Sequence, residues 1–239
     1  MQHILYIMLN DGVPILPNEK LDKLFPHLEE VGIPDTAAVK RGKKLIKTHL
    51  PSEMLSMSIE AKYIFIARNP KDCVVSFFHH TRGFPKHYDF EDGDFDVYFD
   101  LFCEGKVDFG SYFKTLRSWF DRKEEENVLF LTYEKIQEDK AGAIRTIAKF
   151  IGENIEKKLS QENGVLMDKI LKYSSLEEMK KNPLRFCSAR KSAHEPFIRS
   201  GKVGGWDELV TKEQGERLDE MMANEFTQEE LQYLGAKYY

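Results

Sequence analysis

The sequence lacks a long apolar run, a cysteine pair and a secretion signal. No apolar stretch approaches the roughly 18 residues that a membrane span needs, and the first ten residues have neither the charged start nor the cleavage site of a signal peptide. The three cysteines, Cys73, Cys103 and Cys187, are too widely spaced for a CxxC motif or a disulfide framework. These absences predict a cytoplasmic protein with no membrane partner.

The sequence also lacks an excess of basic residues. Lys and Arg total 35 against 40 Asp and Glu, which gives a net charge of −5. With no basic field, nucleic acid is not an expected partner, and any anionic ligand must be held by local groups. Of the 239 residues, 41% are hydrophobic and 12% aromatic. That content is enough for one sizeable core, so we expect a single domain over residues 1–239.

Short apolar, β-branched runs alternate with helical patterns, and this alternation predicts an α/β fold with a parallel sheet. Strands are expected at residues 44–49, 62–68 and 127–133. Helices are expected at residues 70–80, 97–104, 110–121, 141–151 (with Gly152 as C-cap), 165–181 and 212–226 (opened by a Thr211–Gln214 capping box). Residues 182–208 have no apolar periodicity and are expected to form a long loop.

The first chemical pattern begins where the strand at 62–68 meets the next helix. Arg68 ends the strand, Asn69 is the expected N-cap, Pro70 occupies the first helical position and Asp72 the first turn. An arginine there could fork two hydrogen bonds to a phosphate, and Ser76, two turns on, could add a hydroxyl. Taken alone, the pattern fits a structural arginine beside an ordinary helix cap equally well.

A second pattern is the segment Lys47-Thr48-His49, whose two-residue period would place Lys47 and His49 on one strand face. A histidine kept neutral by a cationic neighbour suits general-base work, and the lysine could stabilise developing charge. An isolated histidine is more often structural. We therefore expect a structural role for the other histidines, which are His3, His27, His79, His80, His87 and His194.

A third pattern is the basic, glycine-rich stretch Phe197–Trp206, in which Arg199 and Lys202 could clamp an anion. A flexible surface loop would have the same composition. Together with Phe109-Gly-Ser-Tyr-Phe, Trp119 and Leu-Thr-Tyr-Glu at 131–134, however, the three patterns match one family in order and spacing. The chain resembles the cytosolic sulfotransferases from Gln2 to its last predicted helix. The resemblance implies a three-layer, P-loop-like fold.

The resemblance also implies a donor and a set of site residues. The donor would be 3′-phosphoadenylyl sulfate, which leaves as adenosine 3′,5′-bisphosphate, and no metal is required. His49 would be the catalytic base, with Lys47 assisting at the transferred group. The implied cofactor-binding residues are Arg68, Ser76 and Arg199 at the 3′-phosphate with Ser200 and Gly201 beside it, and Tyr133 and Ser174 at the adenine.

The sequence departs from the family in several places. The family's Lys-Ser-Gly-Thr-Thr-Trp-like phosphosulfate loop and its strand would precede Met1, so we expect residues 1–239 alone to turn over negligibly. Ser200 replaces a lysine, and Leu176 an aromatic that stacks on adenine. The dimerisation motif is only partly kept, with Asp207 for lysine and Lys212 for valine, although Thr211 and Glu216 remain; at most a weak homodimer is expected.

Three functions are compared. The first is sulfuryl transfer to a hydroxyl or amine of a small, largely apolar phenol, alcohol or amine. The second is an inactive nucleotide and small-molecule binder of the same fold. The third, a nucleotide kinase, is disfavoured because no GxxxxGK[ST] motif occurs. The resemblance places four aromatic residues near the acceptor, each of which fits an ordinary core position as well: Phe25, Phe84, Tyr88 and Phe90.

Overall fold

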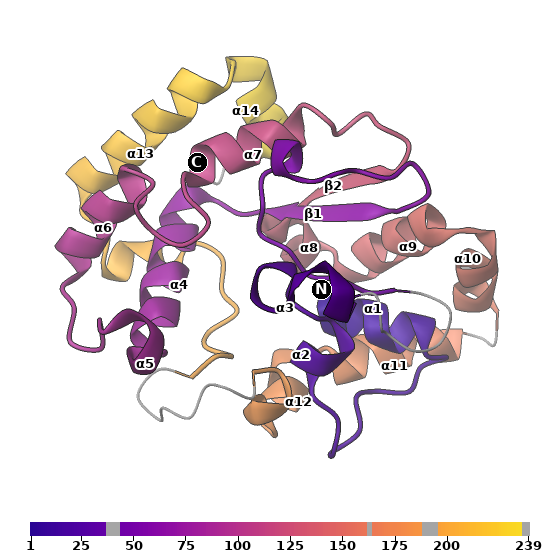
Figure 1. The fold of residues 1–239 in the computed structure, drawn as a ribbon. Coiled ribbons are helices and arrows are strands. Elements are labelled where there is room, and N and C mark those ends of the chain that lie inside the picture. Colours follow the sequence, from indigo (N-terminus) through magenta and orange to yellow (C-terminus); the bar gives the residue numbers. More distant parts are fainter. Residues whose placement is uncertain (37–43, 162–163, 188–195, 236–239) are drawn as a thin grey trace. The chain divides into compact units, whose positions relative to one another are not determined.

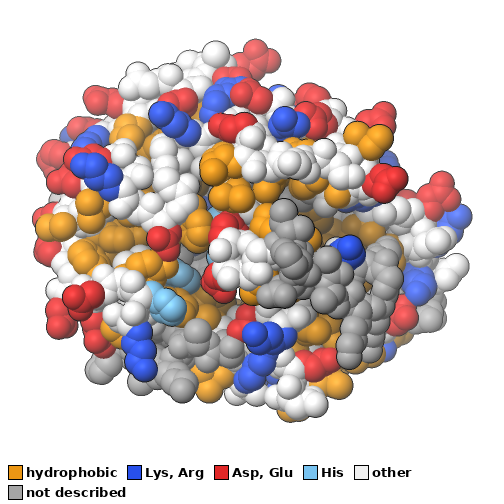
Figure 2. Space-filling view, in the orientation of Figure 1, with side chains coloured by type: hydrophobic (Ala, Val, Ile, Leu, Met, Phe, Trp, Pro, Cys, Tyr) orange, Lys and Arg blue, Asp and Glu red, His pale blue; other side chains and the backbone are white. Residues whose placement is uncertain are grey.

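The computed structural model describes residues 1–36, 44–161, 164–187 and 196–235. The chain divides into two compact units, one of Met1–His49 with Lys140–Gly201 and one of Leu50–Asp139 with Lys202–Tyr239. Figure 1 traces their elements, and each unit is treated by itself. Within the described ranges, no helix is both long and apolar enough to cross a membrane. Acidic and basic side chains are interspersed over the face in Figure 2, as the small net charge predicts.

The first unit is helical. Helix α1 packs on α11, and α9, α10 and α11 pack on one another. A buried cluster that includes Tyr6, Ile15 and Phe186 joins α1 to the segments on either side of residues 188–195. The helices are α1 (Gln2–Leu9), α2 (Leu21–Leu24), α3 (Leu28–Thr36), α9 (Lys140–Ile151), α10 (Glu153–Ser160), α11 (Val165–Tyr173) and α12 (Leu176–Lys180), with the 3-10 helix η3 (Pro183–Arg185).

The second unit contains the parallel pair β1 (Tyr63–Ala67) and β2 (Val128–Thr132). Their register runs from Tyr63 opposite Val128 to Ala67 opposite Thr132, so both carboxyl ends lie at one edge. The unit's helices are α4 (Pro70–Arg82), α5 (Pro85–Tyr88), α6 (Phe95–Cys103), α7 (Tyr112–Phe120), α8 (Tyr133–Glu138), α13 (Lys212–Glu225) and α14 (Gln228–Leu234), with the 3-10 helices η1 (Ser52–Met54) and η4 (Gly205–Glu208).

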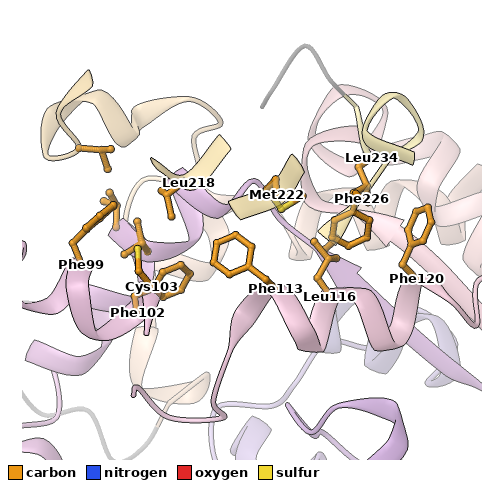
Figure 3. Close-up of a cluster of buried hydrophobic side chains, with 14 of the residues drawn as sticks. Phe99, Phe102, Cys103, Phe113, Leu116, Phe120, Leu218, Met222, Phe226 and Leu234 are labelled. Carbon is orange, nitrogen blue, oxygen red and sulfur yellow. The ribbon is translucent and has the colours of Figure 1, made fainter. Parts of the chain in front are cut away.

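Aromatic side chains dominate the core of the second unit. Helices α6, α7, α13 and α14 all contribute to it, and Phe120 meets both Phe130 of β2 and Phe226 edge-on. Such edge-to-face contacts add to the stabilisation that burial provides. Figure 3 shows the side chains of Phe99, Phe102, Cys103, Phe113, Leu116, Phe120, Leu218, Met222, Phe226 and Leu234.

Most predicted elements are confirmed. The strands at 62–68 and 127–133 and the helices at 70–80, 97–104, 110–121, 141–151 and 212–226 are present with ends shifted by a few residues. Gly152 ends α9 through its N–H to Ala148 O and begins α10, which the sequence did not reveal. The Thr211–Gln214 capping box opens α13 as predicted, and a second box at Thr227 opens α14, which was missed. Within the described ranges, Cys73, Cys103 and Cys187 form no disulfide with one another.

The strand predicted at 44–49 is wrong. The segment makes a single parallel bridge, between Lys47 and His27. The N–H of Lys47 donates to Pro26 O, and Leu28 N–H donates to Lys47 O. The partner segment is too short for a ladder, because it lies between the end of α2 and the start of α3 at Leu28.

The single helix predicted at 165–181 is also wrong. It breaks between Ser174 and Ser175 into α11 and α12. The Ser174 hydroxyl donates to Ile170 O, and the Ser175 hydroxyl accepts from Glu178 N–H as the N-cap of α12. Serine hydroxyls offer the backbone local partners that compete with a continuous helix.

His3 of α1 is a buried histidine whose two ring nitrogens have no hydrogen-bond partner among the described residues. Burial lowers the pKa of His3 from 6.5 to about 4, and nearby positive charges such as Arg185 add to the effect. The unfolded chain therefore binds this proton at a higher pH than the folded chain. Stability should fall as the pH drops from 6.5 towards 4, by at most about 3 kcal/mol from this group.

We expect His3→Phe to remove most of that acid sensitivity, because phenylalanine keeps the edge contact that His3 makes with Phe186. The measurement is the free energy of unfolding in urea at pH 7 and pH 4.5. The exposed His87, changed to Phe, is the matched control and should keep the wild-type pH dependence. Equal acid sensitivity of His3→Phe and wild type would contradict the prediction.

Candidate functional site

The junction of β1 and α4 forms as the sequence predicts. Asn69 caps α4 by accepting from Lys71 N–H at 2.8 Å, and Pro70 occupies the first turn. The backbone N–H of Asn69 donates at 2.8 Å to Glu134, which follows β2 and is fully buried. Burial raises the pKa of Glu134, an effect that the Asn69 N–H opposes. The two strand ends are thereby tied together by a charge-assisted hydrogen bond.

Arg68 is half-buried at this junction. Its guanidinium lies over the ring of Tyr133, 4.6 Å from the centroid, and one terminal nitrogen donates to Lys202 O at 3.4 Å. Its Nε is buried and has no partner among the described residues. A buried donor without a partner is costly, and an anionic oxygen would satisfy it. The structure therefore brings Arg68 and Tyr133 into contact and leaves the Nε of Arg68 available as a donor among the described residues.

The glycine-rich loop is attached to the same helix within the second unit. Gly204 N–H donates at 2.8 Å to the buried carboxylate of Asp72, in the first turn of α4. Lys71 pairs with Asp219 at 2.7 Å and lies 5.0 Å from the Trp206 ring centroid. These contacts fix the loop's second half beside the helix start. Ser76 is half-buried further along α4.

In the first unit, Lys47 and His49 lie in a cluster of charged and imidazole groups. His49 Nδ1 is 2.8 Å from His27 Nε2, and the backbone N–H of His49 donates to Glu29. His27 Nδ1 is 2.8 Å from Glu30 Oε1. The cluster holds the His49 ring by contacts from a segment about twenty residues earlier.

Burial lowers the pKa of Lys47 from its usual value, while the negative charges of Glu30, Cys187 and Glu29 oppose the shift. The lysine is thus partly withdrawn from water, close to the carboxylates that surround His27. A cation in such a position is well placed to act on charge that develops nearby.

The remaining predicted residues also belong to the first unit. Ser174 is buried, and its carbonyl accepts from Lys140 Nζ at 2.6 Å. Arg199 and Ser200 are half-buried, and Gly201 has a φ of 66°. The positive φ favours glycine at this position, and a Cβ at Gly201 would lie 3.3 Å from the Leu176 side chain. Gly201 and Leu176 are therefore neighbours.

Sequence reasoning missed three residues of the cluster. His27 was assigned a structural role, and Glu29 and Glu30 were not considered. The signal that could have found them is the local pattern His-Leu-Glu-Glu at 27–30, which groups one imidazole with two carboxylates. Nothing in that pattern indicates the partner segment, because the contact with His49 spans 22 residues. His194 lies outside the described residues.

Comparison with known proteins defines the class. The family model described as "Sulfotransferase domain" matches residues 14–232. The chain belongs to this sulfotransferase family. It is therefore an enzyme of the class that uses 3′-phosphoadenylyl sulfate as sulfuryl donor.

Several characterised proteins are similar along most of the chain. Human Sulfotransferase 1C2 is 34% identical over 209 residues, 82% of this chain and 68% of that protein. Sulfotransferase 1B1 of Canis lupus familiaris is 32% identical over 221 residues, 89% of this chain and 71% of that protein. Mouse Sulfotransferase 2A1 is 35% identical over 191 residues, 76% of this chain and 63% of that protein.

Solved structures confirm the α/β sulfotransferase fold. The crystal structure of mouse sulfotransferase SULT7A1 complexed with PAP has a TM-score of 0.75 and 26% identity, covering 99% of this chain and 83% of that one. Retinol dehydratase, in complex with androsterone and the inactive cofactor PAP, has a TM-score of 0.78 and 20% identity, covering 95% and 76%. The unpaired Nε of Arg68 fits a nucleotide phosphate of this kind.

Proposed function

We propose that this sulfotransferase acts on the hydroxyl or amine of a small, largely apolar acceptor. The observation that carries the proposal is a group of half-buried aromatic rings around α5 in the second unit. Phe84 lies 4.8 Å from the His80 ring and 6.5 Å from that of Tyr88. Phe77 and Phe109 stack at 6.2 Å. Half-buried rings of this kind line pockets for apolar ligands.

Three of the four aromatic residues considered for the acceptor thus remain candidates. Phe84, Tyr88 and Phe90 are half-buried, whereas Phe25 is 3% exposed and lies in the core of the first unit. The Tyr88 hydroxyl donates to Asp108, which gives this apolar group a polar edge. Retinol dehydratase, a protein of the same fold, binds androsterone and retinol, both of which are largely apolar alcohols.

The proposed chemistry assigns proton transfer to His49. When bound, the donor supplies a sulfuryl group activated for transfer. Because Nδ1 of His49 contacts His27, we assign the transfer to Nε2, which accepts the acceptor's proton as the acceptor–sulfur bond forms and the sulfur–oxygen bond to the nucleotide breaks. Lys47 stabilises the charge that develops on the transferred group. His27, held by Glu30, orients the His49 ring.

The proposed nucleotide-binding residues follow the resemblance. Arg68, with its unpaired donor, and Ser76 bind the 3′-phosphate, and Tyr133 lies at the adenine. From the first unit, Arg199, Ser200 and Gly201 are proposed for the phosphate and Ser174 for the adenine. We also propose that residues 1–239 form one domain, that the protein is cytoplasmic and that it forms at most a weak homodimer. The inactive-binder alternative gains no support, since the similar proteins are named as sulfotransferases.

The test is a sulfation screen, with labelled donor, of a protein in which a phosphosulfate-binding loop precedes residues 1–239. Hydrophobic phenols, sterol-like alcohols and aryl amines should give labelled product, whereas a sugar should not. Phe84→Ala should raise the KM for an apolar acceptor about tenfold, since a buried phenylalanine contributes roughly 1.5 to 3 kcal/mol. The control is Val97→Ala, an exposed apolar residue of α6. Sulfation of the sugar alone, or an unchanged KM in Phe84→Ala, would refute the acceptor class.

A further inference from the structure

Three potential ligand atoms converge within the first unit. His27 Nε2 lies 2.8 Å from His49 Nδ1 and 3.0 Å from Glu29 Oε2. The ligand atoms of these three residues all lie within 4.8 Å of one another. The residues come from two separate segments, one at the start of α3 and one just after the bridge at Lys47.

The atoms that converge are mostly acceptors. Glu30 Oε1, 2.8 Å from His27 Nδ1, can only accept there, so the Nδ1 of His27 carries the proton. In the neutral ring, Nε2 then presents a lone pair. That lone pair faces a carboxylate oxygen of Glu29 and a ring nitrogen of His49. A proton on His49 Nδ1 can bridge the two rings, and a metal cation in its place would also attract the Glu29 carboxylate.

The donor set is one that zinc favours. Two imidazoles and one glutamate make up a common three-residue zinc set that leaves a fourth position open to water. Zinc-bound histidines usually donate their other ring N–H to a carboxylate, and Glu30 accepts in that way from His27. Bonds of about 2.0 to 2.2 Å would place the donors about 3.3 Å apart, so the two separations measured from His27 Nε2 need open by only about 0.5 Å.

The donors are also held in place before any ion arrives. Thr48 Oγ1 donates to Glu29 Oε1 at 3.0 Å, and the His49 N–H donates to the same oxygen. The other oxygen of Glu29 is the one directed at His27. The side chains of His27 and Glu29 are 10% and 17% exposed. An ion there would be held at a partly exposed site by groups that need little rearrangement.

We propose that His27, Glu29 and His49 form a binding site for a divalent transition-metal ion of the zinc class. The ion takes the place of the proton that bridges His27 Nε2 and His49 Nδ1. The proposed function gives the site a consequence: an ion on His49 Nδ1 lowers the basicity of Nε2 and slows proton transfer. That consequence rests on the proposed function, whereas ion binding itself does not.

The experiment is a titration of the full-length protein with Zn²⁺ alone, without donor or acceptor, in competition with a chromophoric chelator. One equivalent should bind. His27→Phe and Glu29→Gln should each weaken binding at least tenfold, because each removes or neutralises a ligand. Glu30→Gln, which changes an exposed residue behind His27, should weaken it by a smaller factor. Co²⁺ should give the intense visible absorption of a four-coordinate nitrogen and oxygen site.

Two matched controls separate this cluster from other ligands. His87→Phe removes an exposed histidine of the second unit and should leave affinity unchanged. Cys187→Ser removes the thiol that lies near Lys47 and should also leave affinity unchanged. Circular dichroism confirms that each variant is folded. Absence of stoichiometric binding would mean that the cluster holds only a proton, and binding that survives His27→Phe but not Cys187→Ser would place the ion at the thiol; either result overturns the proposal.

Discussion

His49→Ala should lower the turnover of sulfuryl transfer by about 10² to 10⁴, the usual contribution of a positioned general base. His49 is held by His27 at Nδ1 and by Glu29 at its backbone N–H, so its ring has a defined position before an acceptor binds. Alanine removes the proton acceptor, and water would replace it without that positioning. The measurement is kcat in the full-length protein with an acceptor from the screen.

Nucleotide affinity should barely change in the same variant, because the residues proposed for the 3′-phosphate are others. Lys157→Ala, at an exposed residue of α10, is the control, and its kcat should equal that of the wild type. A His49→Ala enzyme with normal turnover would refute the assignment of the base. A fall in turnover that is matched by an equal loss of nucleotide affinity would instead indicate a structural role.

The β1–α4 junction was predictable because its determinants are local. An apolar, β-branched run gives the strand, and Asn69 and Pro70 define the start of the helix within two residues. The capping box at Thr211 is local in the same way. Each of these signals depends on contacts between residues that are close in sequence. Such signals survive folding because the tertiary structure does not have to supply a partner.

The two wrong predictions have different causes. The segment at 44–49 has strand-like residues, but a strand also needs a partner, and its partner is the short stretch at Pro26–His27 between two helices. The helix predicted at 165–181 has continuous apolar periodicity, but Ser174 and Ser175 bond locally and divide it. At 44–49 the strand propensity is overridden because the partner segment is too short. At 165–181 the helix propensity is overridden by the hydrogen bonds of two serine side chains.

The candidate site shows the same division. Lys47 and His49 were identified because they are neighbours in sequence, and Arg68 because it adjoins a helix cap. Tyr133 was assigned from the resemblance, and its ring does contact Arg68. The contact of His27 with His49 could not be predicted, since it depends on how two segments of the first unit fold together. A local sequence pattern thus identifies a single side chain as a candidate, and the structure shows which other side chains contact it.

We expect Arg68→Ala to weaken the binding of adenosine 3′,5′-bisphosphate by several kcal/mol, about 10²- to 10⁴-fold. A hydrogen bond to a charged group contributes about 1.5 to 3 kcal/mol, and the fork geometry of arginine allows two. The side chain is already oriented by the Tyr133 ring and by Lys202 O, so little entropy is lost when a phosphate binds. Arg68→Lys should recover only part of the affinity, because an ammonium group cannot form the bidentate contact.

Isothermal titration calorimetry with the bisphosphate measures the effect, and the same helix provides a matched control. Arg82 lies at the far end of α4, where its Nε donates to Glu91 O. Arg82→Ala removes the same charge without touching the β1–α4 junction, so it should leave affinity unchanged. The difference between the two variants should shrink in high salt, as expected for a contact between charges. Equal affinity of Arg68→Ala and Arg82→Ala would exclude Arg68 from the phosphate site and leave its unpaired Nε without an anionic partner.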